Sequence, residues 1–282
     1  MKKIIDYVNV FQGTRASVEP KPNTLSFLWN SFKGKAGNTS PSACLPFGSV
    51  SCSPYSGGYS SGYGAFKRNG GEIPKTFFEG DKLIGFSHFT HSGSGAFGFY
   101  YNYLVTVPHL EKTDDLFALK EIDNERASVG YYACRFVKEN IQAEVTVSDK
   151  VAIHRYASLS NKPLKIAVDV SNDGLNQPWD DRVFAFSSES ELKVENDCVH
   201  GFVTMQGVKI YFCIACKGDA TLWFDGNEIA DKTLRLTKTD KKFGCSFDAS
   251  DTVAIVKIGF SLTSEDCACK NAKTACDFDT AR

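Results

Sequence analysis

The sequence lacks any long apolar run, and its charges nearly cancel. No stretch of its 282 residues approaches the ~20 apolar residues that span a bilayer. Asp6 follows only two isoleucines, so the N-terminus has no apolar core of a secretory signal. The formal net charge is -1, which gives no electrostatic reason to expect a nucleic-acid or anionic-membrane partner. These absences predict a cytoplasmic protein that binds neither nucleic acid nor a membrane.

The familiar spacing signatures of catalysis are missing too. No nucleophile elbow or dinucleotide fingerprint stands in the strand–helix context that it requires. The Gly- and Ser-rich segment 92–95 does not end in the Lys-Ser/Thr pair of a phosphate loop. Basic stripes interleaved with aromatic residues, which would indicate nucleic-acid binding, are also absent. Composition alone therefore indicates no enzyme class.

The ten cysteines indicate thiols, because without a secretion signal a reducing compartment is expected. Cys213 and Cys216 have CxxC spacing, but they lie in the alternating run 208–216. Residues three apart on a strand point to opposite faces, so these two thiols are not expected to hold one metal ion. Cys267 and Cys269 do not form a matching second pair. We therefore predict that the cysteines are mostly small buried side chains.

Strand-forming residues dominate what is present, with 22 Phe and 11 Tyr against only 2 Met. Short alternating runs separated by turn residues such as Asp225-Gly226 predict an all-β fold. Two packed antiparallel sheets, forming one large twisted β-sandwich, are the natural architecture for so many strands. The predicted strands are 103–107 (ended by Pro108), 130–137, 141–147, 151–156, 164–170, 199–205, 208–216, 220–224 and 253–260.

The C-terminal residues break this pattern. Ser264 can cap a helix, and alanines recur at helical spacing after it. A second cap, Asp277, begins a helix of only five residues, which is too short to be stable alone. We therefore expect a sandwich domain over 1–262 and, over 263–282, the start of a helical linker into a further domain.

Few constellations suggest chemistry. Asp180 and Asp181 are adjacent acids, but neighbours in a loop diverge and a solvated turn is the better interpretation. His88 and His91 could bind a metal, yet no third ligand stands at a sensible spacing. The glycine-rich loop 57–64 presents tyrosines and is either a flexible tip or a binding loop. The residues alone leave two classes open: a sugar- or partner-binding β module, and a fragment of an enzyme whose acid and base lie elsewhere.

A family resemblance runs through nearly the whole chain in order. The opening DYVNVFQGT (6–14), the segment GNTSPSACLPFGSV (37–50) and the loop at 58–63 are similar to motifs of one family. So are GFSHFTHSGSG (85–95), the strands from 130 to 156, and the C-terminal tail. Together they resemble the N-terminal domain of family-92 glycoside hydrolases, the calcium-dependent, inverting exo-α-mannosidases, in a Gram-positive, intracellular branch.

The resemblance implies a galactose-mutarotase-like supersandwich that packs on an (α/α)6 catalytic barrel in the same chain. The implied reaction is inverting hydrolysis of terminal, α-1,2-linked mannose from a mannose-containing glycan, with two carboxylates about 6.5–9.5 Å apart. In the family the barrel supplies the acid, the base and the Ca²⁺ ligands. No catalytic residue or metal ligand is therefore carried onto this sequence. This chain alone is expected to be inactive, and its barrel-facing surface is expected to favour self-association.

The resemblance also implies that one side of the substrate pocket comes from this chain. Aromatic faces stack on pyranose rings, which favours the two tyrosines of the loop as sugar contacts. For the histidine, a pocket hydrogen-bond donor and a buried loop anchor are equally good interpretations. The alternative to a mannosidase domain is a freestanding carbohydrate-binding or scaffold sandwich. The predicted substrate-binding residues are Tyr59, Ser60, Ser61, Gly62, Tyr63 and His88.

Overall fold

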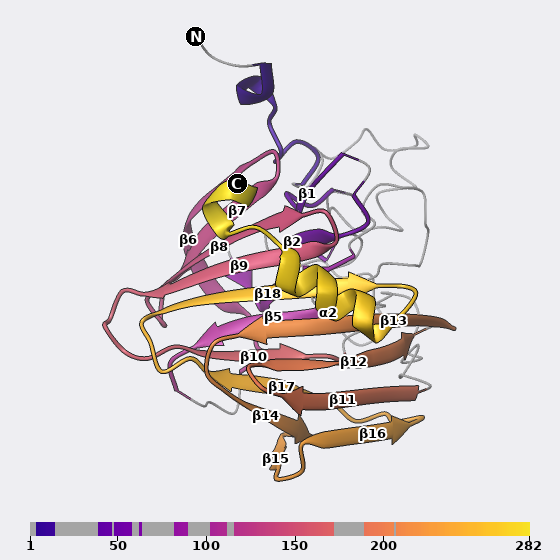
Figure 1. Ribbon diagram of the computed structural model, residues 1–282. Helices are drawn as coiled ribbons and strands as arrows, with labels where there is room; N and C mark the ends of the chain where they lie inside the picture. The colour runs from indigo at the N-terminus through magenta and orange to yellow at the C-terminus, as the bar shows by residue number, and fades with distance from the viewer. Residues whose placement is uncertain are drawn as a thin grey trace, which may run out of the picture.

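Two antiparallel sheets lie face to face and enclose the core (Figure 1). Successive side chains of a strand point to opposite sides of a sheet, so each sheet turns one set of side chains toward this core. The predicted all-β sandwich with a short C-terminal helix is confirmed. The structure is a computed structural model that describes residues 4–14, 39–46, 48–57, 62–63, 82–89, 102–111, 116–171, 189–205 and 207–282.

The first sheet has eight strands and joins segments from both halves of the chain. Each strand pairs antiparallel with its neighbours in the sheet. Their order across the sheet is β1 (Ala43–Cys44), β2 (Ser51–Tyr55), β4 (Gly85–His88), β5 (Tyr103–His109), β10 (Lys165–Asp169), β17 (Phe243–Asp248), β14 (Asp219–Phe224) and β15 (Asn227–Ile229).

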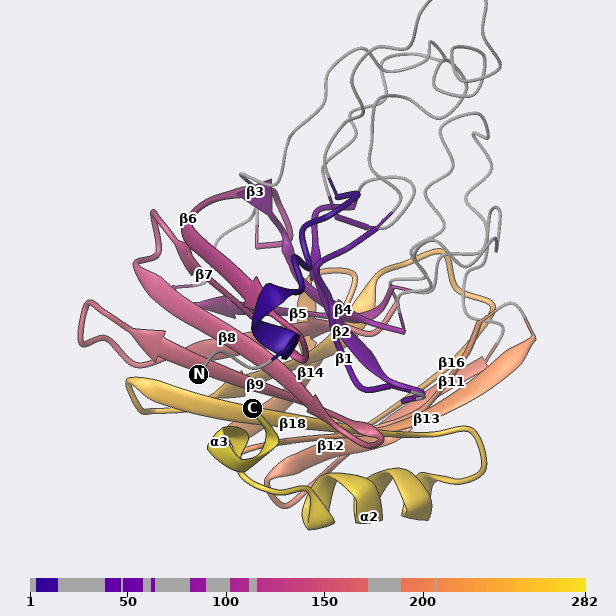
Figure 2. The ribbon, with the colours of Figure 1, turned by 90° about the horizontal axis from the view of Figure 1, so that it is seen from above.

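The second sheet has ten strands and carries both C-terminal helices, α2 (Glu265–Thr274) and α3 (Phe278–Ala281), on its outer face (Figure 2). A short 3-10 helix, η1 (Ile4–Tyr7), lies near the N-terminus. The strand order is β16 (Thr233–Thr237), β11 (Glu189–Glu195), β12 (Cys198–Met205), β13 (Val208–Cys216), β18 (Val253–Ser261), β9 (Val151–Ser158), β8 (Ile141–Ser148), β7 (Tyr131–Phe136), β6 (Lys120–Ser128) and β3 (Lys82–Leu83).

Strand β9 shows how the sandwich separates its two faces. Tyr156 points into the core between the sheets. Ile153, on the opposite face, packs against Phe278 of α3. Arg155 shares that outer face, and its guanidinium lies 4.2 Å from the centre of the Phe278 ring. The same strand therefore contributes to the interior and holds the C-terminal helix.

Helix α2 lies close against the ten-stranded sheet because the residues at the contact are small. Its first turn is capped by Ser264, whose side chain accepts a hydrogen bond from the Cys267 backbone N–H. A Cβ on Gly259 of β18 would lie only 2.4 Å from the Ala268 carbonyl oxygen. Cys213 of β13 packs under Ala268 and Ala272. This contact requires the absence of a side chain at Gly259.

The predicted strands are present, with two differences. Pro108 was expected to end its strand, but β5 continues to His109. Thr106 is the last residue of β5 that pairs with β4, and beyond it β5 pairs only with β10 among the described residues. Proline is tolerated where one side of a strand is unpaired. Strands β3, β4, β6, β11, β15, β16 and β17 were not predicted. The residues of β6, β11 and β16 are more polar than those of the predicted strands, and β3 and β15 are only two and three residues long.

The prediction for the CxxC pair is confirmed. Cys213 faces the helix α2, whereas Cys216 lies in the core between the sheets. The two thiols therefore point to opposite faces of β13, as strand alternation requires. The Asp225-Gly226 turn is confirmed as well, since both residues have positive φ between β14 and β15, as a tight hairpin turn needs. In the described part of the chain, no helix has the length and apolarity of a membrane span.

Candidate functional site

The predicted pocket loop is anchored at its C-terminal end by Gly62. Gly62 has a φ of +81°, and a Cβ there would lie 2.7 Å from Asn102 Oδ1. That oxygen also accepts a hydrogen bond of 2.8 Å from Ser87 Oγ, and the Gly62 carbonyl accepts one from the Ser56 N–H. The loop end is thereby tied to β4 and to the start of β5. Tyr59, Ser60 and Ser61, like His91, Asp180 and Asp181, lie outside the described residues.

Tyr63 is a second anchor of the same loop. Its side chain is only 4% exposed. Its hydroxyl donates a 2.8 Å hydrogen bond to Glu125 Oε1 of β6. Tyr132 of β7 donates to the same oxygen at 2.6 Å. In this chain the aromatic face of Tyr63 is thus packed in the core rather than presented to solvent, and its predicted contact with sugar stays untested.

His88 lies inside the sandwich and joins its two sheets. It ends β4, has no exposed surface, and its ring packs beside those of Phe260 and His154. Its Nε2 lies 3.0 Å from Nε2 of His154 in β9. Two interpretations were left open for this residue: a hydrogen-bond donor in the substrate pocket and a buried anchor of the loop. The complete burial of its side chain favours the anchor. The sequence alone suggested no pairing with His154, because the two histidines are 66 residues apart.

The hydrogen bonds around these histidines run in one direction. His88 Nδ1 lies 3.2 Å from the Tyr103 carbonyl, which can only accept, so this nitrogen carries the proton. His88 Nε2 must then accept from the Nε2–H of His154. His154 Nδ1 in turn accepts from the Tyr156 hydroxyl, 2.8 Å away. Each ring nitrogen is satisfied, and both imidazoles are neutral.

Burial explains why both rings stay neutral. Desolvation lowers the pKa of His88 from 6.5 to about 4, against the opposing effect of its backbone acceptors. The pKa of His154 is also lowered, first by burial and then by the nearby His88. Neutral, fully buried imidazoles without contact to solvent do not serve as a general acid or base on a substrate. Their effect is to bind the two sheets together under the predicted pocket loop.

Cys52 completes the only group of three metal-ligand side chains among the described residues. Its Sγ lies 3.7 Å from His154 Nε2, and the ligand atoms of Cys52, His88 and His154 all lie within 4.8 Å of one another. Calcium takes six to eight oxygen ligands. A sulfur and two imidazoles do not fit that ion, and the hydrogen bonds above satisfy both rings without one. This group of three therefore does not fit calcium.

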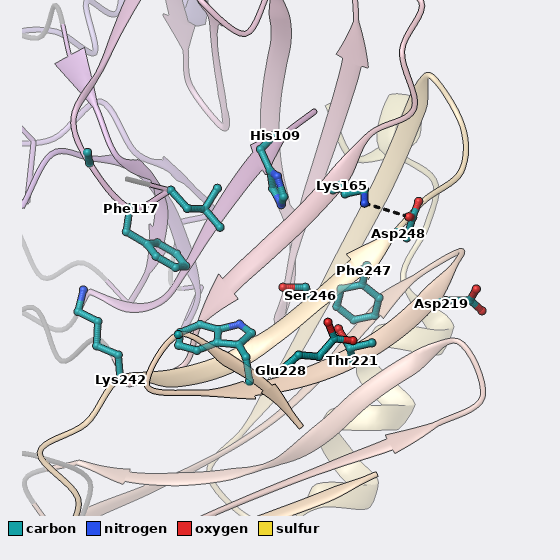
Figure 3. Close-up of a pocket in the computed structure, with 14 residues that line it drawn as sticks. His109, Phe117, Lys165, Asp219, Thr221, Glu228, Lys242, Ser246, Phe247 and Asp248 are labelled. Carbon is teal, nitrogen blue, oxygen red and sulfur yellow. Dashed lines mark ion pairs between the residues drawn. The ribbon is translucent and has the colours of Figure 1, made fainter. Parts of the chain in front are cut away.

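A separate pocket opens on the outer face of the eight-stranded sheet. It has a volume of about 810 Å³ and is formed by β5, β10, β14, β15, β17 and the loop before β6. Phe117 lies on one side, with the Lys165–Asp248 ion pair across from it and Ser246 between them (Figure 3). His109, which lines the pocket, ends β5, whereas Asn102, which lies next to Gly62, immediately precedes the first residue of β5. A strand rises about 3.3 Å per residue, so the length of β5 places the pocket some 20 Å from Gly62.

An aromatic wall forms part of this pocket. The rings of Phe117 and Trp223 have centroids 5.8 Å apart, inclined at 42°. The indole lies against Gly244 of β17, where a Cβ would come within 2.6 Å of it. The sequence analysis missed this site because its residues come from segments between 109 and 248. The only available signal was that Trp223 falls on the outward-facing positions of its strand.

The comparisons with known proteins agree with one another. Residues 7–261 match the family described as the glycosyl hydrolase family 92 N-terminal domain. A family GH92 α-mannosidase from Bacteroides thetaiotaomicron superposes on 100% of this chain with a TM-score of 0.73 and 20% sequence identity. A family GH92 inverting mannosidase from Bacteroides thetaiotaomicron VPI-5482 also covers 100% of the chain, with a TM-score of 0.66 and 17% identity. The chain spans 36% and 35% of those two structures. No curated protein sequence matches it.

Proposed function

Because the chain belongs to the family of glycosyl hydrolase family 92 N-terminal domains, we propose that it is the front domain of an exo-α-mannosidase. The match over residues 7–261 carries this proposal. The structural neighbours support it with the same fold over the full length of the chain. The proposed reaction is hydrolysis of terminal α-1,2-linked mannose from a glycan, with inversion at the anomeric carbon.

The catalytic groups are proposed to lie on a second domain. Inversion needs a carboxylic acid that protonates the leaving oxygen and a carboxylate that activates water, about 6.5–9.5 Å apart. The titratable groups that the structure describes at the predicted site are two neutral, buried histidines and the Glu125 that accepts from Tyr63 and Tyr132. An (α/α)6 barrel in the same protein would supply both carboxylates and the calcium ligands.

The contribution of this chain is to shape one side of the pocket. Gly62 and Tyr63 anchor the loop, and His88 holds the strand beneath it. Tyr59, Ser60 and Ser61 are the residues that we propose to reach the sugar. The part of this side that the structure describes is rigidly packed, and a preorganised pocket side lowers the ordering cost of substrate binding.

The test compares this chain with a longer protein that continues past Arg282 into a helical barrel. The 282-residue chain should not hydrolyse aryl α-mannosides or α-1,2-mannobiose. The longer protein should hydrolyse both and release β-mannose first, as monitored by NMR of the anomeric proton. Turnover by the short chain, or retention of configuration by the long one, would refute the proposal. A coding sequence that stops after codon 282 would favour the freestanding carbohydrate-binding alternative.

A further inference from the structure

The pocket on the outer face holds two buried polar atoms that lack partners among the described residues. They are Nε2 of His109 and Nε1 of Trp223, in side chains that are 6% and 8% exposed. His109 Nδ1 lies 3.1 Å from the Glu111 carbonyl, so it donates and leaves Nε2 as an acceptor. Indole Nε1–H only donates. The pocket thus has one unsatisfied donor and one unsatisfied acceptor.

Such atoms are costly to leave unpaired. A buried polar group without a partner destabilises the folded state, because it has given up its hydrogen bond to water without replacing it. A ligand that supplies both an acceptor and a donor would recover this free energy on binding. A hydroxyl group can do both. The unpaired donor and acceptor of the pocket therefore suit a ligand that carries several hydroxyl groups.

The charges around the pocket argue against an anionic ligand, since both lysines are paired and Asp219 and Glu228 add two further carboxylates to the lining. Lys165 is paired with Asp248 at 3.4 Å, and Lys242 with Asp169 at 3.5 Å. Burial, followed by the neighbouring lysines, keeps the pKa of His109 below its usual value, so its ring adds no positive charge at neutral pH. A phosphate or sugar acid would have to displace a carboxylate from its lysine. A neutral ligand needs no such exchange, and the half-exposed Lys165–Asp248 pair can donate to one hydroxyl and accept from its neighbour.

The aromatic wall and the volume of the pocket also suit a sugar ligand. Phe117 is partly exposed and, with the buried Trp223 beside it, offers a ring surface of the kind on which the C–H face of a pyranose packs. The volume of about 810 Å³ lies within the range of ligand sites and accommodates a short oligosaccharide. We propose that this pocket is a second, non-catalytic binding site for a short neutral glycan, held between the aromatic wall and the Lys165–Asp248 pair.

The test uses ligand-observed NMR on the purified chain. The first probes are methyl α-mannopyranoside and α-1,2-mannobiose, a choice that rests on the proposed function; methyl α-glucopyranoside and glucuronic acid follow. Trp223→Phe keeps a ring but removes the donor, and should weaken binding about tenfold. Phe117→Ala should weaken it about fivefold through lost stacking. The control is Phe202→Ala. Phe202 is an aromatic residue on β12 that packs beside Tyr211 and Lys209, away from the pocket.

Each outcome decides the proposal. Binding of a neutral sugar that Trp223→Phe and Phe117→Ala weaken and Phe202→Ala leaves unchanged supports it, once circular dichroism shows that the variants are folded. No binding of any neutral sugar at millimolar concentration overturns it, as does equal binding by all variants or a preference for glucuronic acid.

The hydrolysis assay is independent of this binding test. An active mannosidase whose front domain binds no sugar refutes only the second site, and an inactive protein that binds sugar here refutes only the proposed function.

Discussion

His88 Nε2 lies 3.0 Å from His154 Nε2, and this contact links β4 of one sheet to β9 of the other. Both rings are fully buried. Their proton positions follow from one fixed acceptor, the Tyr103 carbonyl. The pair therefore acts as a polar cross-link between the two sheets, and its effect on stability depends on pH.

Acidification should destabilise the fold through this pair. The pKa of folded His88 is about 4, below its ordinary 6.5, so between these values the unfolded chain binds a proton that the folded chain does not. Its stabilising effect is complete above pH 6.5 and is lost as the pH falls toward 4, by about 3 kcal/mol for this residue. Urea unfolding from pH 7.5 to 4.5 should show this loss.

The variant His88→Phe isolates the effect from titrating carboxylates. It keeps a ring beside Phe260 and His154 but removes one titrating group. It should be less stable than the original protein at pH 7.5, because His154 loses its acceptor, yet its stability should fall less steeply on acidification. Parallel stability–pH curves for the two proteins would contradict this explanation.

The loop anchor at Gly62 should not tolerate a side chain. Gly62→Ala places a Cβ in a left-handed conformation and against the Asn102 amide, and should cost about 1–3 kcal/mol for the backbone alone. Gly130→Ala is a matched control, since Gly130 has a φ of +78° and nothing lies within 4 Å of a Cβ there. In urea unfolding, the excess cost of Gly62→Ala over Gly130→Ala measures the clash. Equal costs would show that Asn102 moves aside freely.

Helix α3 should be held by burial of Phe278 rather than by its ion pair. Phe278 is 3% exposed among Tyr131, Val151 and Ile153, and Phe278→Ala should cost about 3–5 kcal/mol if the rest of the site does not collapse. Asp279 bonds Arg155 at 2.9 Å, but its side chain is 76% exposed. Asp279→Ala should therefore cost less than about 1 kcal/mol.

Hydrogen exchange of the amides at Thr280 and Ala281 separates the two contributions. Phe278→Ala should remove the protection of these amides, and Asp279→Ala should leave most of it. If Asp279→Ala removed more protection than Phe278→Ala, the contact of Arg155 with Asp279, and not the burial of Phe278, would position α3.

Much of the fold was predictable from local pattern. The meander from 130 to 158 was predicted because its strands alternate regularly and are separated by short turns. The opposite directions of Cys213 and Cys216 followed from the same alternation. Strand β6 was missed because its residues are mostly charged or polar and only partly buried, with a register shift between Asp123 and Arg126. Pro108 misled the prediction because its tolerance depends on which neighbours β5 has.

The sequence by itself determined the regularly alternating strands, the caps at Ser264 and Asp277, and the motifs that lead to one family, because each of these depends on residues close together in the chain. Only the tertiary structure decided what the functional candidates contact. It buried the side chains of His88 and Tyr63 in the sandwich, and it joined His109, Lys165, Trp223 and Asp248 in a pocket. These contacts depend on strand order and register, which are set by packing across the whole sandwich.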